Sequence, residues 1–280
     1  MNGDWPAELH SLWREPWIGA IWTIWGACVG SFLNVCIYRI PLGRSLIHPP
    51  SSCSACGRAL RWYENVPILS WLALRGRCRC RLIKLDVRYL LVEAVTAFLA
   101  WLLWWQNWSL PAAGVWLVFF SFLIVATGID WDHMIIPDRI SLGGAGLAFL
   151  AQIFGSAHIE GLIGWRDAVI GAAAGAGILW AIGCMGRCMF KRDAMGIGDV
   201  KLMLLIGAMV GWQGVLFVIG SSACIGAVLG TVLMHSSHWR RYEGRLPYGP
   251  FLALGAILWV LGGKEWWRNY FDFWNHLRWM

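Results

Sequence analysis

Long apolar runs separated by short polar segments set the pattern of this chain. Uncharged stretches such as 17–38 and 112–129 are long enough to cross a hydrocarbon core of roughly 30 Å as helices. Eight spans are expected in chain order: 17–38, 89–106, 112–129, 139–155, 166–186, two within 200–234, and 248–263. The pattern therefore predicts an all-α polytopic membrane protein with about eight transmembrane helices.

The composition supports this class. The chain is 58% hydrophobic and 14% charged, contains 22 Trp, and has a mean hydropathy of +0.56, which is far outside the usual range for soluble domains. The first run, 17–38, is not a cleavable signal peptide, because it is too long and acidic residues precede it. The net charge of +7 does not indicate nucleic-acid binding, because the basic residues gather in particular loops.

Loop charge predicts the orientation, since short cytoplasmic loops collect Lys and Arg. The segment 39–88 holds ten such residues, and the loops at 187–201 and 235–247 are also basic. If both later loops are cytoplasmic, an even number of crossings separates them, and 211–214 is the outside turn of a tight helix pair. Eight helices with both termini outside the cytoplasm follow. Seven helices or a re-entrant hairpin also fit the pattern.

Asp130 and Asp199 are the candidate catalytic residues. Each adjoins an apolar run, and Asp199 ends the segment Gly196-Ile197-Gly198-Asp199. Ionisable groups at membrane depth are costly, and they commonly mark functional sites. The predicted topology brings both acids to the cytoplasmic face, because two crossings separate them. Two facing carboxyl groups that share one proton can activate water, which predicts an aspartic peptidase embedded in the membrane.

Other polar residues near the two acids have simpler interpretations. Gly196 and Gly198 would let the backbone bend or approach a substrate strand closely. Lys201 would tune the acid pair or only neutralise the interface. Asp138 precedes an apolar run and is predicted to cap a helix, and Asp132 points away from the first acid on a helix. The alternative for the pair is two membrane-edge acids bound to Lys or Arg or serving an ion path, because G-x-G-D alone is a weak motif.

Four of the nine cysteines lie in the segment 39–88. Cys53 and Cys56 have the spacing of metal ligands, and Cys78 and Cys80 can complete a tetrahedral Cys₄ zinc site. Thiols in a cytosolic loop stay reduced, which favours a metal over disulfides. Structural Zn²⁺ would hold a small loop that has too little core of its own, and free thiols are the alternative.

Motifs along the chain resemble those of the bacterial type IV prepilin leader peptidases. In chain order they are Gly30 through Pro41, Cys53-Ser-Ala-Cys56-Gly57, Arg61 through Pro67, Asp130 through Asp138, Gly196 to Asp199, and Pro247-Tyr248-Gly249-Pro250. The similarity runs from about residue 17 to 260. Some family members have two C-x-x-C pairs, and this chain departs from them at the second, because Cys78-Arg79-Cys80 is one residue short.

The resemblance implies a bifunctional enzyme of the bacterial inner membrane with its active site facing the cytoplasm. It would cut the basic leader from type IV prepilins or type II secretion pseudopilins after a glycine, with Asp130 and Asp199 as the catalytic acids. It would then methylate the new N-terminus with S-adenosylmethionine. No Gly-rich fingerprint marks a methyl-donor site, so methylation rests on the resemblance alone.

These inferences divide the chain into three parts: a tail and first helix (1–38), a cytoplasmic Cys-rich subdomain associated with zinc and methyl transfer (39–88), and a transmembrane peptidase domain (89–280). The expected partners are prepilin or pseudopilin substrates and the lipid bilayer, with no nucleic acid; the oligomeric state stays open. Trp266, Trp267 and Trp274 are expected in an interfacial belt.

Two rival functions remain open. A helical transporter or channel would use the two acids as a proton path, and a metal- or redox-sensing membrane protein would depend on the cysteines of 39–88. The ordered set of motifs favours the peptidase, because neither rival needs it.

Overall fold

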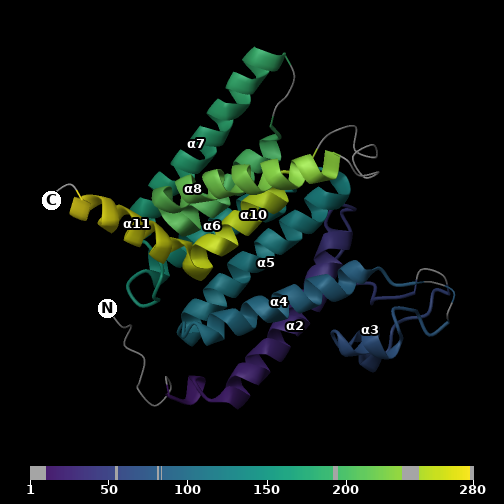
Figure 1. The fold of residues 1–280 in the computed structure, drawn as a ribbon. Helices are drawn as coiled ribbons and strands as arrows, with labels where there is room; N and C mark the ends of the chain where they lie inside the picture. Colours follow the sequence, from purple (N-terminus) through teal and green to yellow (C-terminus); the bar gives the residue numbers. More distant parts are fainter. Residues whose placement is uncertain are drawn as a thin grey trace. The chain divides into compact units, whose positions relative to one another are not determined.

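The computed structural model describes residues 11–53, 56–80, 82, 84–191, 195–234 and 246–277. Within these ranges the chain is helical, and its only β-pairing is two isolated bridges. The elements are α2 (Pro16–Arg39), η1 (Trp62–Asn65), α3 (Leu69–Ala73), α4 (Val87–Trp105), α5 (Leu110–His133), α6 (Asp138–Gly155), α7 (Trp165–Phe190), α8 (Ile197–Met234), α10 (Gly249–Leu258), η2 (Trp259–Gly263) and α11 (Lys264–Leu277) (Figure 1).

Five of these helices are long and apolar enough to cross a membrane: α2, α4, α5, α7 and α8. The predicted all-α class is confirmed, and the five helices agree with a polytopic membrane protein. The count of eight crossings stays a prediction.

Local sequence signals explain where several helices begin and end. The side chain of Asp86 accepts a 2.9 Å hydrogen bond from the backbone N–H of Arg88, which caps the start of α4. Pro16 begins α2, where its missing N–H would have had no helical partner. Lys191 adopts a left-handed conformation directly after α7 and ends that helix.

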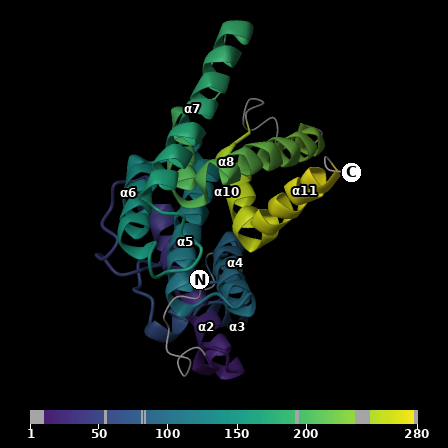
Figure 2. The same ribbon diagram turned by 90° about the vertical axis from the view of Figure 1, so that its left-hand side faces the viewer.

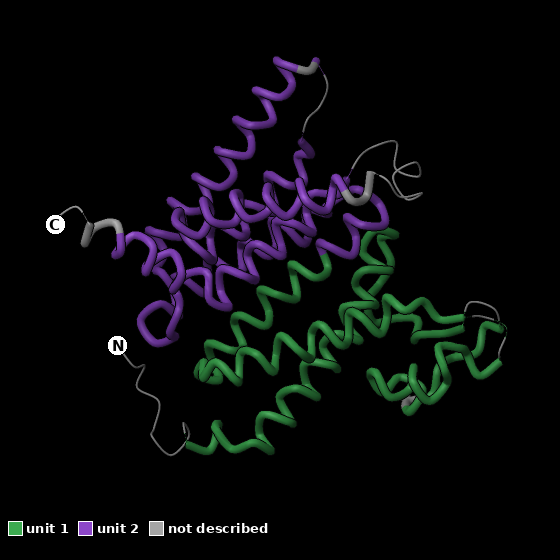
Figure 3. The backbone as a smooth tube through the Cα atoms, in the orientation of Figure 1, with its two compact units in different colours: residues 1–125 green, residues 126–280 purple. Residues whose placement is uncertain are grey.

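The chain divides into two compact units, residues 1–125 and 126–280 (Figure 3). In the first unit α2 packs against α4. Polar side chains join the two helices: the Trp22 indole N–H donates to the Ala100 carbonyl at 2.9 Å, and the Asn34 amide donates to the Tyr89 carbonyl at 3.0 Å. Such bonds satisfy polar groups that would otherwise face hydrocarbon.

A small loop region that includes η1 and α3 connects α2 to α4. The buried Glu93 of α4 accepts a 2.7 Å hydrogen bond from the backbone N–H of Ile68, which directly precedes α3. Ile68 has φ of 63°, a left-handed conformation that is strained for a β-branched residue. Glu93 therefore anchors a strained point of the loop to an apolar helix.

In the second unit, α8 is a helical hairpin that reverses direction at Gly211. This glycine has φ of 73° and ψ of 177°, which are not helical. A Cβ built on Gly175 of α7 would lie 2.9 Å from the Met203 carbonyl oxygen and 3.3 Å from Val215 Cγ2. Positions 203 and 215 would be about 18 Å apart in a straight helix, so both can reach Gly175 only if the chain turns back. The reversal agrees with the expected turn at 211–214.

Close packing of α7 on α8 depends on two facing glycines. A Cβ on Gly207 would overlap the carbonyl oxygen of Gly171, and a Cβ on Gly171 would overlap that of Gly207. Small residues let helix backbones approach closely in lipid, where packing replaces the hydrophobic effect as the driving force.

A single buried amide fixes the α6–α7 connection against α8. Gln152 of α6 donates through Nε2 to the Ala208 carbonyl at 3.2 Å, and its Oε1 accepts from the backbone N–H groups of Ile163 and Gly164 at 2.9 and 3.0 Å. Because the Gln152 side chain is fully buried, these bonds satisfy a group that would be costly to leave unpaired.

We predict that Gly207→Ala destabilises the second unit by about 1–3 kcal/mol, because the added methyl group must push α7 and α8 apart. Gly220→Ala in the same element is the matched control, since nothing lies within 4 Å of its Cβ position. Thermal unfolding in a mild detergent measures both. Equal melting temperatures for the two variants would contradict the close α7–α8 contact.

Candidate functional site

The structure places Asp130 and Asp199 in one buried region of the second unit. Asp130 lies near the end of α5 and Asp199 is the third residue of α8. Their exposed fractions are only 5% and 9%, and their carboxyl groups lie within electrostatic range of each other. Two acids that are 69 positions apart in the sequence therefore lie near each other, away from bulk solvent.

The start of α10 and the α5–α6 connection bring these acids together. The backbone N–H of Gly249 donates to Asp130 Oδ2 at 3.0 Å. Ile136 lies between the two sides of the site: a Cβ on Gly249 would be 3.3 Å from Ile136 Cδ1, and a Cβ on Gly198 would be 3.2 Å from Ile136 Cβ. Both glycines thus leave room for a shared apolar neighbour beside the acids.

Asp199 belongs to the first turn of α8, where the helix dipole favours negative charge. Its backbone N–H donates to the Gly196 carbonyl at 3.2 Å, and a Cβ on Gly196 would lie 3.2 Å from Asp199 Oδ2. The glycine therefore lets the carboxyl group fold back against the backbone that precedes the helix.

Lys201 pairs with Asp138: Lys201 Nζ donates to Asp138 Oδ1 at 2.6 Å. The prediction that Asp138 caps its helix is wrong, because Pro137 occupies the cap position and Asp138 is already the first helical residue. A side chain inside the helix cannot take the cap geometry, and it turns instead to the cation on α8. The pair is partly exposed and joins the starts of α6 and α8.

Sequence reasoning gave no chemical role to the residues at the start of α10. The Tyr248 hydroxyl lies 2.7 Å from the Ser222 hydroxyl. Because Ser222 donates its own proton to the Ile219 carbonyl at 3.0 Å, Tyr248 is the donor in the pair. This bond ties the residue before Gly249 to the second leg of α8. The available signal was a glycine flanked by Pro247 and Pro250 before an apolar run.

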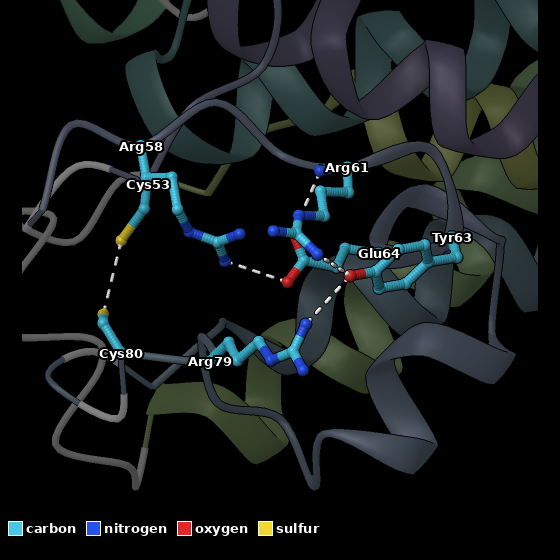
Figure 4. Close-up of polar contacts among 7 residues, drawn as sticks. All are labelled: Cys53, Arg58, Arg61, Tyr63, Glu64, Arg79 and Cys80. Atoms are coloured by element: carbon cyan, nitrogen blue, oxygen red, sulfur yellow. Dashed lines mark hydrogen bonds and ion pairs between the residues drawn. The ribbon is translucent and has the colours of Figure 1, made fainter.

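The four cysteines of the loop region in the first unit converge. The sulfur atoms of Cys53, Cys56, Cys78 and Cys80 all lie within 4.8 Å of one another. The Cys53 and Cys80 sulfurs are 3.7 Å apart (Figure 4). A tetrahedron with metal–sulfur bonds of 2.3 Å has an edge of about 3.8 Å, so the donor set can hold a metal ion such as zinc. The short C-x-C pair does not prevent this convergence.

A buried carboxylate supports the region around these cysteines (Figure 4). Glu64 accepts hydrogen bonds from Arg58 Nη2 and from the backbone N–H of Arg61, both at 2.9 Å. These two bonds hold the pKa of Glu64 below its ordinary value. The Tyr63 hydroxyl accepts from Arg61 at 2.8 Å and from Arg79 at 2.9 Å. Since Arg79 lies between Cys78 and Cys80, the network links both cysteine pairs to η1.

Comparison with protein families identifies the class of this arrangement. A family model described as Bacterial Peptidase A24 N-terminal domain matches residues 24–107, which include most of α2, the cysteine cluster and α4. A second, the Type IV leader peptidase family, matches residues 117–231, which include both buried acids. No solved structure matches the chain significantly.

Known relatives narrow the class further. The prepilin leader peptidase/N-methyltransferase of Pectobacterium carotovorum is 34% identical over 276 residues, covering 90% of this chain and 94% of the relative. That of Pseudomonas putida is 34% identical and covers 87% and 90%. That of Myxococcus xanthus is 40% identical over 215 residues, covering 75% of this chain and 61% of the longer relative. The chain therefore belongs to the type IV prepilin leader peptidase family.

We predict that Glu64→Gln loosens the cysteine-rich loop at neutral pH, because the neutral amide binds Arg58 less strongly. Hydrogen–deuterium exchange over residues 56–66, compared at equal pH, measures this effect. Because the pKa of Glu64 is lowered on folding, its stabilisation is complete above the ordinary glutamate pKa of about 4.3 and is lost as the pH falls through the lowered value.

The difference between wild type and Glu64→Gln should therefore shrink in acid. Arg75→Met, in the same loop but outside the network, is the control and should exchange like the wild type. Faster exchange in Glu64→Gln at acid pH only would contradict the assigned role.

Proposed function

We propose that this protein cuts the leader peptide from type IV prepilins or pseudopilins after a glycine and then methylates the new N-terminus. The observation that supports cleavage is the pair of buried aspartates, Asp130 and Asp199, held within electrostatic range in a chain of the leader peptidase family. The relatives named prepilin leader peptidase/N-methyltransferase support both activities.

In the proposed reaction the two aspartates share one proton. The ionised carboxylate removes a proton from a water molecule, whose oxygen attacks the carbonyl carbon of the glycine itself. The protonated carboxyl group hydrogen-bonds the carbonyl oxygen and stabilises the tetrahedral intermediate. The carboxyl group that took the proton from water then gives it to the amide nitrogen, the C–N bond breaks, and the new N-terminal amine is released. No covalent bond to the enzyme forms.

The surroundings of Asp130 and Asp199 suit this division of labour. The Gly249 N–H binds one oxygen of Asp130, which leaves the other oxygen available to water or substrate. Gly196 and Gly198 carry no side chains, so an extended substrate strand can approach Asp199 closely. The Lys201–Asp138 pair then acts by holding α6 beside α8.

We also propose that the four cysteines bind structural Zn²⁺, which would fix a loop that contains little apolar core. S-adenosylmethionine would supply the methyl group for the second activity.

The proposed setting is the bacterial inner membrane. About eight crossings would place the cysteine-rich loop and both aspartates on the cytoplasmic side. The excess of Lys and Arg in the loops predicts the same side. The transmembrane helix of the prepilin would then lie in the same bilayer as the enzyme.

We predict that Asp130→Asn and Asp199→Asn each abolish leader cleavage while the protein still inserts into membranes. Asp132→Asn is the matched control, because Asp132 is an exposed neighbour in the same helix. Purified enzyme is incubated with a prepilin and S-adenosylmethionine, and mass spectrometry weighs the product. Wild-type cleavage by either variant would refute the proposal.

The same variants separate the two proposed activities. Supplied with a substrate whose leader is already removed, both variants should still add a methyl group, because methyl transfer does not need the acid pair. Loss of methylation as well as cleavage would show that the substitutions disturb the whole fold.

We predict that Cys53→Ser or Cys78→Ser lowers the zinc content of the purified protein from about one equivalent to a small fraction. Both side chains are buried within the cluster. Cys224→Ser, at an exposed position on α8, is the control and should keep the metal. Elemental analysis by mass spectrometry measures the content. Equal zinc in Cys53→Ser, Cys78→Ser and the control would rule out the site.

A further inference from the structure

We infer that α11 is a membrane-surface helix, which lies in the lipid–water interface with its aromatic face among the lipids. The inference goes beyond the proposed catalytic activities, because it concerns how the second unit is held in the bilayer. Four kinds of observation carry it: the register of the helix, the exposure of its aromatic side chains, its contacts with the rest of the unit, and its length and charge.

The register of α11 separates polar from aromatic residues completely over 264–273. At 100° per residue, the five polar positions occupy one continuous arc of about 140°. The five aromatic positions occupy the opposite arc of about 160°. The polar residues are Lys264, Glu265, Arg268, Asn269 and Asp272, and the aromatic residues are Trp266, Trp267, Tyr270, Phe271 and Phe273.

Most side chains of this aromatic face are exposed. The exposed fractions are 59% for Trp266, 45% for Tyr270, 45% for Phe271 and 59% for Phe273. A contiguous exposed apolar patch of this kind marks a surface that binds another protein or a membrane. The beginning of the helix is attached to the rest of the second unit.

Two aromatic contacts provide that attachment. The rings of Trp266 and Phe217 of α8 are 6.2 Å apart, and the rings of Trp267 and Trp259 of η2 are also 6.2 Å apart. The chain bends sharply at η2, where Gly262 is not helical, so α11 leaves the direction of α10 (Figures 1 and 2). The aromatic face of α11 therefore contacts α8 and η2 at the beginning of the helix, and its later residues are exposed to the surroundings of the second unit.

Lipid is the occupant that fits the length and chemistry of α11. Its 14 residues extend about 21 Å, which is too short to cross a core of about 30 Å. Trp and Tyr favour the headgroup level, where a ring can be buried and its polar edge hydrated. A helix with segregated polar and aromatic arcs lies flat in that layer.

The polar arc indicates which lipids are needed. Lys264 and Arg268 are balanced by Glu265 and Asp272, so the described part of the polar face carries no net charge. Attraction to anionic headgroups therefore contributes little, and the aromatic face provides the binding. Zwitterionic lipid alone should suffice.

The test places a photoreactive residue, p-benzoyl-phenylalanine, at single positions of the full-length enzyme in phosphatidylcholine nanodiscs. Position 273 samples the aromatic arc, and position 269 samples the polar arc of the same helix. Replacing Phe273 by this larger aromatic residue keeps the character of the face. After illumination, mass spectrometry identifies what has been captured.

We expect lipid adducts at position 273 in several-fold excess over position 269, with similar yields in phosphatidylcholine and in mixtures with phosphatidylglycerol. Cross-links from position 273 to a second copy of the chain, or to a prepilin added to the nanodiscs, would overturn the inference in favour of a protein-binding face. Equal lipid capture at both positions would also overturn it, because a helix lying in the interface must distinguish its two faces.

Discussion

The second unit depends on placing two carboxyl groups where water hardly reaches. Such groups are expensive to bury, and the fold meets this constraint with very few polar partners. Asp130 accepts a hydrogen bond from the Gly249 N–H. Asp199 lies in the first turn of α8, where the helix dipole favours a negative charge. Ile136 fills the space between the glycines on either side. Three segments far apart in sequence, the end of α5 and the beginnings of α8 and α10, must therefore meet at one point.

The remaining packing of this unit holds those helix ends in place. The hairpin at Gly211 returns α8 along α7, and the facing glycines let the two helices touch. Gln152 fixes the loop after α6. The hydrogen bond between Tyr248 and Ser222 fixes the backbone directly before Gly249. In the first unit the cysteine-rich loop is held by other contacts, because it has little apolar core. The four converging cysteines and the Glu64 network take the place of apolar burial there.

Features that depend on local sequence were predictable. The uncharged run 17–38 corresponds to α2 (Pro16–Arg39), and 89–106 corresponds to α4 (Val87–Trp105), since an apolar run of bilayer length has few alternatives to a helix. Loop charge located the reversal at Gly211. The two aspartates and four cysteines were named as candidates from their spacing and surroundings, and each set lies close together in the structure. Their catalytic and metal-binding roles stay predictions.

Features that depend on tertiary contacts were not predictable in this way. The sequence offers Asp138 as a helix cap, but only the folded chain brings Lys201 within 2.6 Å and draws the carboxylate away. Likewise, nothing local indicates that the amide of Gly249 binds Asp130, because that bond joins residues 119 positions apart. The role of Glu64 depends on how Arg58 folds back across η1.

The direct connection between Gly249 and α11 has a mechanical consequence. A continuous segment, α10 followed by η2, joins the amide that binds Asp130 to the aromatic contacts at Trp259 and Trp267. If the lipid surface holds α11, the thickness of the surrounding bilayer determines how deep in the membrane the segment of α10 and η2 lies. A mismatch in thickness must then be absorbed by tilting, and the tilt is transmitted to the amide that binds Asp130. The lipid composition of the membrane would thereby become a determinant of the geometry at the acid pair.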